Sequence, residues 1–147
     1  MANDAQKAGL TNYLRYFRAL DQGLNGLDEC LHPQVIFQDP FNRVQGPAAV
    51  RLILQHFIDH VEQPAFGILN EAWSESVCFV RWDFSGHLAG LGDWQFPGVS
   101  EIHFDEEGRV TLHLDHWDAA AHFLNKLPVL GALNRFVSRK LTHIDTY

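Results

Sequence analysis

The sequence is poor in cysteine and in long apolar runs, and each shortage removes a class of protein. Its 147 residues include two cysteines, Cys30 and Cys78, which are too far apart in the chain to form a C-x-x-C motif. A disulfide framework and a zinc ribbon are therefore excluded. No apolar run approaches the roughly 18–20 residues of a membrane span. The first residues lack a basic region followed by an apolar stretch, so we expect no signal peptide and a cytoplasmic location.

Basic residues are also scarce. Eleven Lys and Arg stand against eighteen Asp and Glu, which gives a net charge of −7. A negative protein repels phosphate backbones, so neither nucleic acid nor a membrane is an expected partner. The length suits one domain, and 46% apolar residues are enough for a core of its own. Eleven Phe, four Trp and three Tyr indicate either a bulky core or a lined pocket.

Hydrophobic periodicity predicts helices first and strands later. Helices are predicted where apolar residues recur at helical spacing or where a residue suited to begin a helix occurs. The predicted helices are 5–22, 27–31, 47–61, 118–126 and 129–141. The alternation typical of strands covers 35–38, 66–73, 77–88, 94–104 and 109–117. A bulge is expected near Pro97, and Asp105 begins a hairpin turn. This order predicts an α+β fold, with helices packed on one face of a curved antiparallel sheet.

Two of these strands carry a face that mixes apolar and ionisable residues. In strand 77–88 one face holds Val77, Phe79, Arg81 and Asp83, and the wholly apolar opposite face holds Cys78, Val80, Trp82 and Phe84. In the last strand the mixed face holds His113, Asp115 and Trp117. Apolar walls with a few charges are typical of small-molecule pockets, whereas charged residues in general more often face solvent. If the mixed faces line a pocket, the apolar row packs against another subunit.

Three short motifs occur in a recognisable order: Phe37-Gln38-Asp39-Pro40, Gly46 opening a helix, and Asp115-His116-Trp117-Asp118 ending the last strand. Their order and spacing resemble the NTF2-like superfamily, and best of all its SnoaL-like and ketosteroid-isomerase-like branch, up to about residue 125. The resemblance implies a single domain over 1–147, folded as a cone in which a strongly curved sheet wraps around N-terminal helices. Residues 129–141 would form an additional C-terminal helix. A homodimer through the outer sheet face is also implied, covering Val80, Trp82 and Phe84.

Part of the pattern resembles limonene-epoxide-hydrolase-like members of this superfamily. Arg81 and Asp83, one residue apart, match their Arg-x-Asp, and Asp115 matches the carboxylate of their last strand. The resemblance implies that Asp115 takes a proton from water, that Asp83 donates one to the epoxide oxygen, and that Arg81 holds both. Phe37 and Asp39 stand where that branch has a Tyr and an Asn that help to position the water.

Another part resembles ketosteroid-isomerase-like members, whose proton-moving base is an Asp before a Pro. Asp39 matches that base, and Tyr16 falls near the place of a tyrosine that stabilises the oxyanion. Ser100 occupies the place of the second oxyanion donor, a protonated Asp in that branch. Losing one such donor commonly costs about 10²–10³-fold in rate. The sequence therefore combines elements of two catalytic patterns.

The resemblance as a whole implies a cofactor-free isomerase or hydrolase with an apolar cavity for a small hydrophobic molecule, such as a steroid, terpene or polyketide. The catalytic candidates are Asp39, Arg81, Asp83 and Asp115, and the substrate-binding candidates are Tyr16, Phe37, Phe79, Ser100, His113 and Trp117. The alternative is a non-catalytic binding or dimerising domain, in which the same charges form a structural network. His56 and His60 lack the Glu of H-E-x-x-H, so no metal is expected.

Overall fold

The computed structural model describes residues 1–141, which belong to two compact units. The first unit is Met1–Trp117, and the second begins at Asp118. The described residues form four α-helices and one sheet of six strands, so the α+β prediction is confirmed. Each unit is taken by itself below.

The first unit opens with helix α1, Asp4–Arg18. The side chain of Asn3 accepts a hydrogen bond from the Gln6 backbone at 2.8 Å, and the Gln6 side chain accepts one from the Asn3 backbone at 2.9 Å. This reciprocal pair satisfies two backbone donors at the start of the helix. The predicted helix over 5–22 ends earlier, and two short 3-10 helices follow, Leu20–Gln22 and Leu27–Cys30. Helix α2 is Pro47–His60, with the proline in its first turn as expected.

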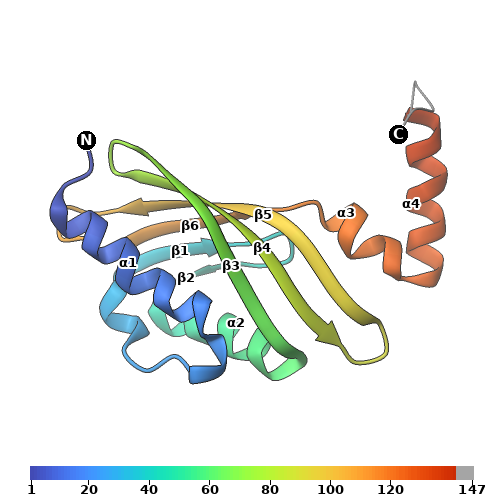
Figure 1. Ribbon diagram of the computed structural model, residues 1–147, viewed down its shortest axis with the longest axis horizontal. Helices are drawn as coiled ribbons and strands as arrows, with labels where there is room; N and C mark the ends of the chain where they lie inside the picture. The colour runs from blue at the N-terminus through green and yellow to red at the C-terminus, as the bar shows by residue number, and fades with distance from the viewer. Residues whose placement is uncertain (142–147) are drawn as a thin grey trace. The chain divides into compact units, whose positions relative to one another are not determined.

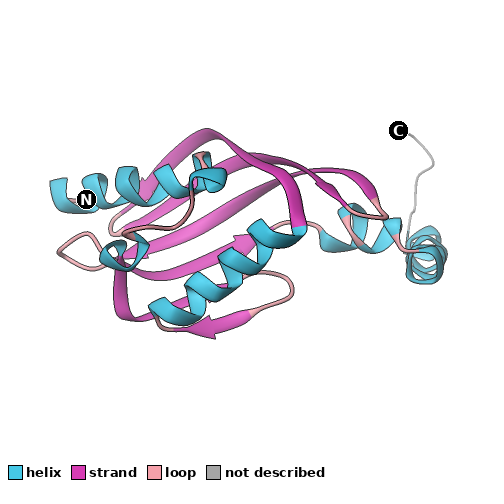
Figure 2. Ribbon diagram, turned by 90° about the horizontal axis from the view of Figure 1, so that it is seen from below, coloured by secondary structure: helices cyan, strands magenta, loops and turns pink. Residues whose placement is uncertain are grey.

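Six strands form one sheet in the order β2-β1-β6-β5-β4-β3 (Figure 1). They are β1 Leu31–Gln38, β2 Arg43–Gln45, β3 Val61–Ser74, β4 Val77–Leu88, β5 Gly92–Phe104 and β6 Val110–His116. The sheet is curved and open, with β2 and β3 at its edges (Figure 2). Neighbouring strands are antiparallel except β1 and β6, which run parallel. That pair is a departure from the predicted antiparallel sheet, and the long intervening chain makes such a crossover possible.

Both α-helices of this unit contact the same face of the sheet, here called the inner face. Tyr13 of α1 contacts His113 of β6, and Phe57 of α2 contacts Phe84 of β4 with ring centroids 5.4 Å apart. The inner-face residues of β4, β5 and β6 are buried: Cys78, Val80, Trp82, Phe84, Trp94, Phe96, Ser100, Ile102 and His113. The core of the unit therefore lies between the inner face and the helices.

The outer face carries the residues of the opposite parity, which corrects the prediction for β4. The row Cys78, Val80, Trp82 and Phe84 was expected to face a second subunit, but it forms part of the core. Arg81 and Asp83 are exposed, and Phe79 has a relative exposure of 41%. The physical reason is desolvation: burying Arg81 and Asp83 under the helices costs far more than burying Trp82 and Phe84.

The expected bulge near Pro97 is absent from the β4–β5 pairing. Its register runs without a shift from Val77–His103 to Leu88–Gly92. Strand β6 pairs with β5 only from Val99 onward, so Pro97 lies outside the pairing on that side. The neighbouring Gly98 is required for packing, because a Cβ there would lie 2.2 Å from the ring of Trp82.

The turn between β5 and β6 is held by Asp105, as its sequence predicted. The carboxylate accepts hydrogen bonds from the backbone N–H and from Nε of Arg109, both at 2.8 Å. Partial burial acts to raise the pKa of Asp105, but the bonds and charge of Arg109 outweigh it and hold that pKa below its ordinary value.

Replacing Asp105 by Asn is expected to lower the free energy of unfolding by about 1 kcal/mol at neutral pH, because an amide binds Arg109 more weakly. A carboxylate with a lowered pKa stabilises the fold above the unfolded pKa of about 3.9 and loses this contribution as pH falls through the folded pKa. Urea unfolding of both proteins between pH 7 and pH 3 checks this. The difference between the two free energies of unfolding is expected to shrink toward pH 3. A difference that stays constant contradicts a stabilising role for the Asp105 charge.

The second unit contains helix α3, Ala119–His122, a 3-10 helix, Leu124–Lys126, and helix α4, Pro128–Leu141. Asp118 caps α3 through the Ala121 backbone N–H at 2.9 Å, and Asn134 of α4 donates to Ala120 and Asn125. The predicted helix over 129–141 is thus confirmed. The apolar arc of α4 is exposed and consists of Val129, Leu130, Leu133, Phe136, Val137 and Leu141. Within residues 1–141, no helix is both long and apolar enough to cross a membrane.

Candidate functional site

Four polar side chains meet on the inner face of the first unit. Trp82 comes from β4, Ser100 from β5, and His113 and Asp115 from β6. Ser100 lies opposite Asp115 in the β5–β6 register and opposite Val80 in the β4–β5 register. Because residues two apart share a face of a sheet, this register brings all four to one region.

A continuous set of hydrogen bonds joins these side chains. Trp82 Nε1 donates to Ser100 Oγ at 2.8 Å, and Ser100 Oγ lies 2.5 Å from Asp115 Oδ1. His113 Nε2 lies 2.7 Å from the same Oδ1 and 3.2 Å from Ser100 Oγ. All these contacts of Asp115 involve Oδ1. Its second oxygen, Oδ2, has no hydrogen bond to any residue of the described part of the chain.

The network is largely removed from water. The relative exposure is 2% for His113 and 5% for Ser100, and the side chain of Asp115 is 15% exposed. Every buried side-chain N and O atom among the described residues has a hydrogen-bond partner. Polar groups at such depth stabilise one arrangement only when they are all satisfied, so this network fixes the geometry of Asp115.

Helix α1 supplies a further member, Tyr13, which the sequence analysis missed. Its hydroxyl lies 2.8 Å from His113 Nδ1, and the residue is fully buried. Burial, and next to it the charge of Asp115, raises the pKa of the Tyr13 phenol well above its ordinary value. The available signal was the position of a tyrosine within the apolar stripe of α1, since a buried hydroxyl needs a partner.

Apolar side chains close around the network. They are Leu14 and Phe17 of α1 and Phe66 and Ile68 of β3, and with Trp82, Ser100, His113 and Asp115 they line a cavity of about 10 Å³. That is room for about one water molecule. A larger molecule reaches Asp115 only if some of these side chains move.

Aromatic rings fill the inner face on both sides of this cavity. Phe37 lies against His113 with ring centroids 4.7 Å apart, and Trp117 stacks on Phe96 at 4.1 Å. Two of the predicted substrate-binding residues, Phe37 and Trp117, are therefore placed on the inner face, with Phe37 buried. Phe79, another predicted substrate-binding residue, lies on the outer face instead.

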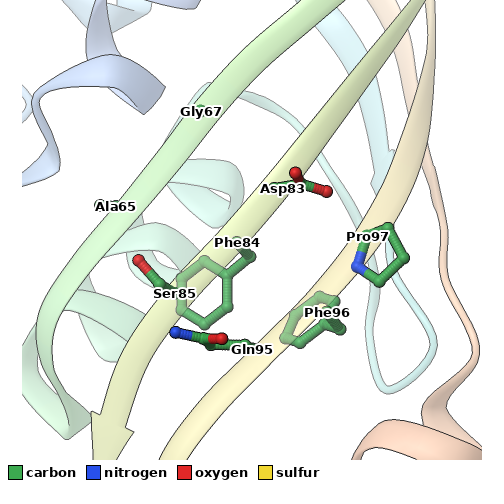
Figure 3. Close-up of a pocket in the computed structure, with 8 residues that line it drawn as sticks. All are labelled: Ala65, Gly67, Asp83, Phe84, Ser85, Gln95, Phe96 and Pro97. Carbon is green, nitrogen blue, oxygen red and sulfur yellow. The ribbon is translucent and has the colours of Figure 1, made fainter.

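Arg81 and Asp83 do not join Asp115. In the β4–β5 register they lie opposite Val99 and Pro97 on the outer face, whereas Asp115 lies opposite Ser100 on the inner face. Asp83 instead borders an open groove of about 560 Å³ on β3, β4 and β5 (Figure 3). The Asp-Arg-Asp arrangement expected from the sequence is therefore not assembled, because strand parity separates its members.

Asp39 and Tyr16 are each used in a local contact. The Asp39 carboxylate accepts hydrogen bonds from the backbones of Phe41 and Asn42, at 2.8 and 2.7 Å, and from the Asn42 side chain. The side chain of Asp39, the first residue of a turn, thus stabilises that turn. The Tyr16 hydroxyl donates to the Asn25 carbonyl at 2.7 Å. Neither residue lines the cavity beside Asp115.

No metal centre is evident in the described range. Residues 1–141 contain no group of three or more His, Cys, Asp or Glu placed to hold a metal ion. His56 and His60 lie close together on α2, with ring centroids 4.0 Å apart, but His60 Nδ1 contacts the His56 carbonyl at 2.8 Å. What the site offers is a carboxylate held by the side chains of Ser100 and His113 in an apolar setting.

Comparison with known proteins assigns the chain to a family. A family model described as a SnoaL-like domain matches residues 13–113. No curated protein sequence matches the chain. An NTF2-like protein of unknown function from Burkholderia pseudomallei is similar in structure, with a TM-score of 0.70, 16% identity, and coverage of 81% of this chain and 95% of that one.

Two similar structures have named activities. A steroid delta-isomerase from Pseudomonas aeruginosa has a TM-score of 0.64 and 21% identity, covering 95% of this chain and 93% of its own. An epoxide hydrolase from M. tuberculosis, of the LEH-like type, has a TM-score of 0.66 and 18% identity, covering 91% and 96%. At these identities the likeness concerns the fold.

Proposed function

Because the chain belongs to the SnoaL-like domain family of the NTF2-like superfamily, we propose that it is a cofactor-free enzyme that moves a proton in a small hydrophobic molecule. Asp115 is the base in this proposal. The observation that carries it is the arrangement of this carboxylate. His113 and Ser100 both hydrogen-bond to Oδ1. Oδ2 has no hydrogen bond from any described residue, and the Asp115 side chain lines a largely apolar cavity.

The surroundings of Asp115 suit a general base. A base must be held in one geometry, must keep an oxygen lone pair available, and must be shielded from bulk water. Ser100 and His113 hold the carboxylate through Oδ1, and Leu14, Phe17 and Phe66 shield it from bulk water. Apolar walls and one carboxylate match a steroid-, terpene- or polyketide-like substrate better than a charged one.

Between isomerase and hydrolase chemistry, the geometry favours the isomerase type. Opening an epoxide needs a base for water and a separate acid for the epoxide oxygen. The expected acid, Asp83, and its partner Arg81 lie on the outer face. A proton shift beside a carbonyl needs one base that removes the proton and returns it to another carbon, and a single carboxylate such as Asp115 can perform both steps.

A second candidate is binding without catalysis. The cavity beside Asp115 measures about 10 Å³, so a ligand must first displace side chains such as Phe17 or Phe66. In this alternative the network of Ser100, His113 and Asp115 orients a ligand or stabilises the core.

An assay of the purified protein separates these candidates. It uses a 3-keto-5-ene steroid, followed by the absorbance of the conjugated product, and in parallel a panel of small cyclic epoxides. Isomerisation of the steroid without epoxide turnover is the expected result. Epoxide turnover alone favours the hydrolase. If neither reaction occurs although the steroid binds, the binding domain replaces the proposal.

We also propose a homodimer formed through the outer face, in which a second copy covers the exposed Phe79 and the half-buried apolar side chains around it. The register places Val77, Phe79, Val99, Leu112 and Leu114 together on that face. An apolar cluster of this kind on a monomer commonly marks an interface. The cytoplasmic location expected from the sequence stays a prediction.

Replacing Phe79 by Asp is expected to halve the mass measured by light scattering at micromolar concentration, because the new charge is buried unpaired in the interface. Asn12→Asp is the matched control, since it adds the same charge to an exposed position of α1. Equal masses for wild type, Phe79→Asp and Asn12→Asp contradict a dimer through this face.

A further inference from the structure

In the hydrogen bonds around Asp115, the chemistry of each group decides which group donates and which accepts. The indole of Trp82 has only an N–H donor, so the Oγ of Ser100 is the acceptor in their 2.8 Å contact. The single hydroxyl proton of Ser100 then points to Asp115 Oδ1. Oδ1 is therefore an acceptor, as in an ionised carboxylate.

The same reasoning assigns the donor in the contact between His113 and Asp115. Its Nε2 lies 2.7 Å from Asp115 Oδ1, which already accepts the proton of Ser100. Two acceptors do not attract each other, so Nε2 must carry a proton and donate it to Oδ1. Whether His113 is neutral or positive then depends on its other nitrogen, Nδ1.

The partner of Nδ1 is the hydroxyl of Tyr13, 2.8 Å away. Tyr13 is fully buried, and burial raises the pKa of its phenol, so the hydroxyl keeps its proton. If Nδ1 is unprotonated, the phenol donates to it and every group is satisfied. If Nδ1 is protonated, the phenol must accept, and its own proton then has no acceptor among the contacts of the described chain. A buried unsatisfied donor costs about 1–3 kcal/mol.

We propose that Tyr13 is a positioning residue that holds His113 as the neutral tautomer with its proton on Nε2, and so keeps Asp115 without a cationic partner. The consequence of this proposal for catalysis rests on the proposed function, in which Asp115 is the general base. Its claim about His113 stands on the hydrogen bonds and on the burial of Tyr13, whatever the reaction.

The consequence concerns the strength of the base. The groups that face His113 are Tyr13 from α1, Ser100 from β5 and Asp115 from β6, with the rings of Phe17 and Phe37 on its sides. A neutral His113 donates a hydrogen bond to Asp115 without neutralising it. An imidazolium would form an ion pair with the carboxylate, which disfavours the uptake of a proton from a substrate.

The test is NMR of the full-length protein with ¹⁵N-labelled histidine at neutral pH, which distinguishes protonated from unprotonated ring nitrogens. In the wild type, His113 is expected to show a protonated Nε2 and an unprotonated Nδ1. In Tyr13→Phe, Nδ1 is expected to gain a proton in part or all of the molecules. Tyr16→Phe is the matched control, because it removes the same atom from a buried tyrosine of α1 that bonds to Asn25 instead.

Each outcome decides the proposal independently of turnover. A wild-type Nδ1 that is protonated, or an unchanged His113 in Tyr13→Phe with the fold intact, overturns it. A change of His113 in Tyr16→Phe of equal size shows that loosening of α1, not the hydroxyl, is responsible. If the steroid is turned over, Tyr13→Phe is also expected to lose about tenfold in kcat/KM, with little change in KM. Absence of turnover removes the proposed function but leaves the tautomer result standing.

Discussion

Replacing Asp115 by Asn is expected to reduce kcat/KM for the steroid by about 10²–10⁴-fold, the usual contribution of a positioned general base. The amide has nearly the shape of the carboxylate, and its oxygen still accepts hydrogen bonds from Ser100 and His113. What it loses is the basic oxygen. Steady-state kinetics of the two proteins, with circular dichroism to confirm equal folding, provides the measurement.

The matched variant is Asp83→Asn, which makes the same chemical change on the opposite face of the sheet. Asp83 borders the outer groove and is exposed, so its variant is expected to keep kcat/KM within about twofold. The reverse result, with activity lost in Asp83→Asn and kept in Asp115→Asn, places the chemistry on the outer face. Equal and large losses in both variants contradict a site that depends on one carboxylate.

Replacing Gly98 by Ala is expected to lower the free energy of unfolding by about 3 kcal/mol, because the added methyl group overpacks the core. A Cβ at this position would lie 2.2 Å from one atom of the Trp82 ring and 2.4 Å from another. The ring is buried and bonded to Ser100, and the cavity of about 10 Å³ beside it is too small to take the displaced ring. The free energy of unfolding, measured in urea by tryptophan fluorescence, checks this expectation.

Gly67→Ala is the control for this prediction. Gly67 also lies in the sheet, but a Cβ there would meet only the Asp83 carbonyl oxygen, at 3.7 Å, which is an ordinary contact. A change of less than about 1 kcal/mol is expected. If the two glycine variants lose equal stability, the general effect of glycine replacement, and not Trp82, explains the result. In Gly98→Ala the displaced ring is also expected to weaken the hold of Ser100 on Asp115.

Periodicity predicted the helices and the long strands well, because their apolar residues are closely spaced and repeated. It also placed His113 and Asp115 on one face of the last strand. It did not reveal β2, a strand of three residues, or the first half of β1, which contains Pro33. Such segments are held by pairing with distant partners, and a local pattern carries no signal for that.

The two faces of β4 show the limit of strand parity. Alternation separates Arg81 and Asp83 from Trp82 and Phe84, but it does not state which set lies inside. The family pattern suggested charges in a pocket, whereas the cost of desolvation favours the aromatic set in the core. Tyr13 illustrates a second limit. Its contact with His113 joins residues 100 apart in sequence, so only the fold brings it to the site.

Chemical-shift mapping with the 3-keto-5-ene steroid tests the central claim, that the functional site lies on the inner face around Asp115. Two side-chain signals report on the two faces: the indole N–H of Trp82, bonded to Ser100 inside, and the amide of Gln95, on the outer groove. We expect the Trp82 signal to shift and saturate as steroid is added, while the Gln95 signal stays in place. A shift of Gln95 with Trp82 unmoved would place binding in the outer groove and contradict this account.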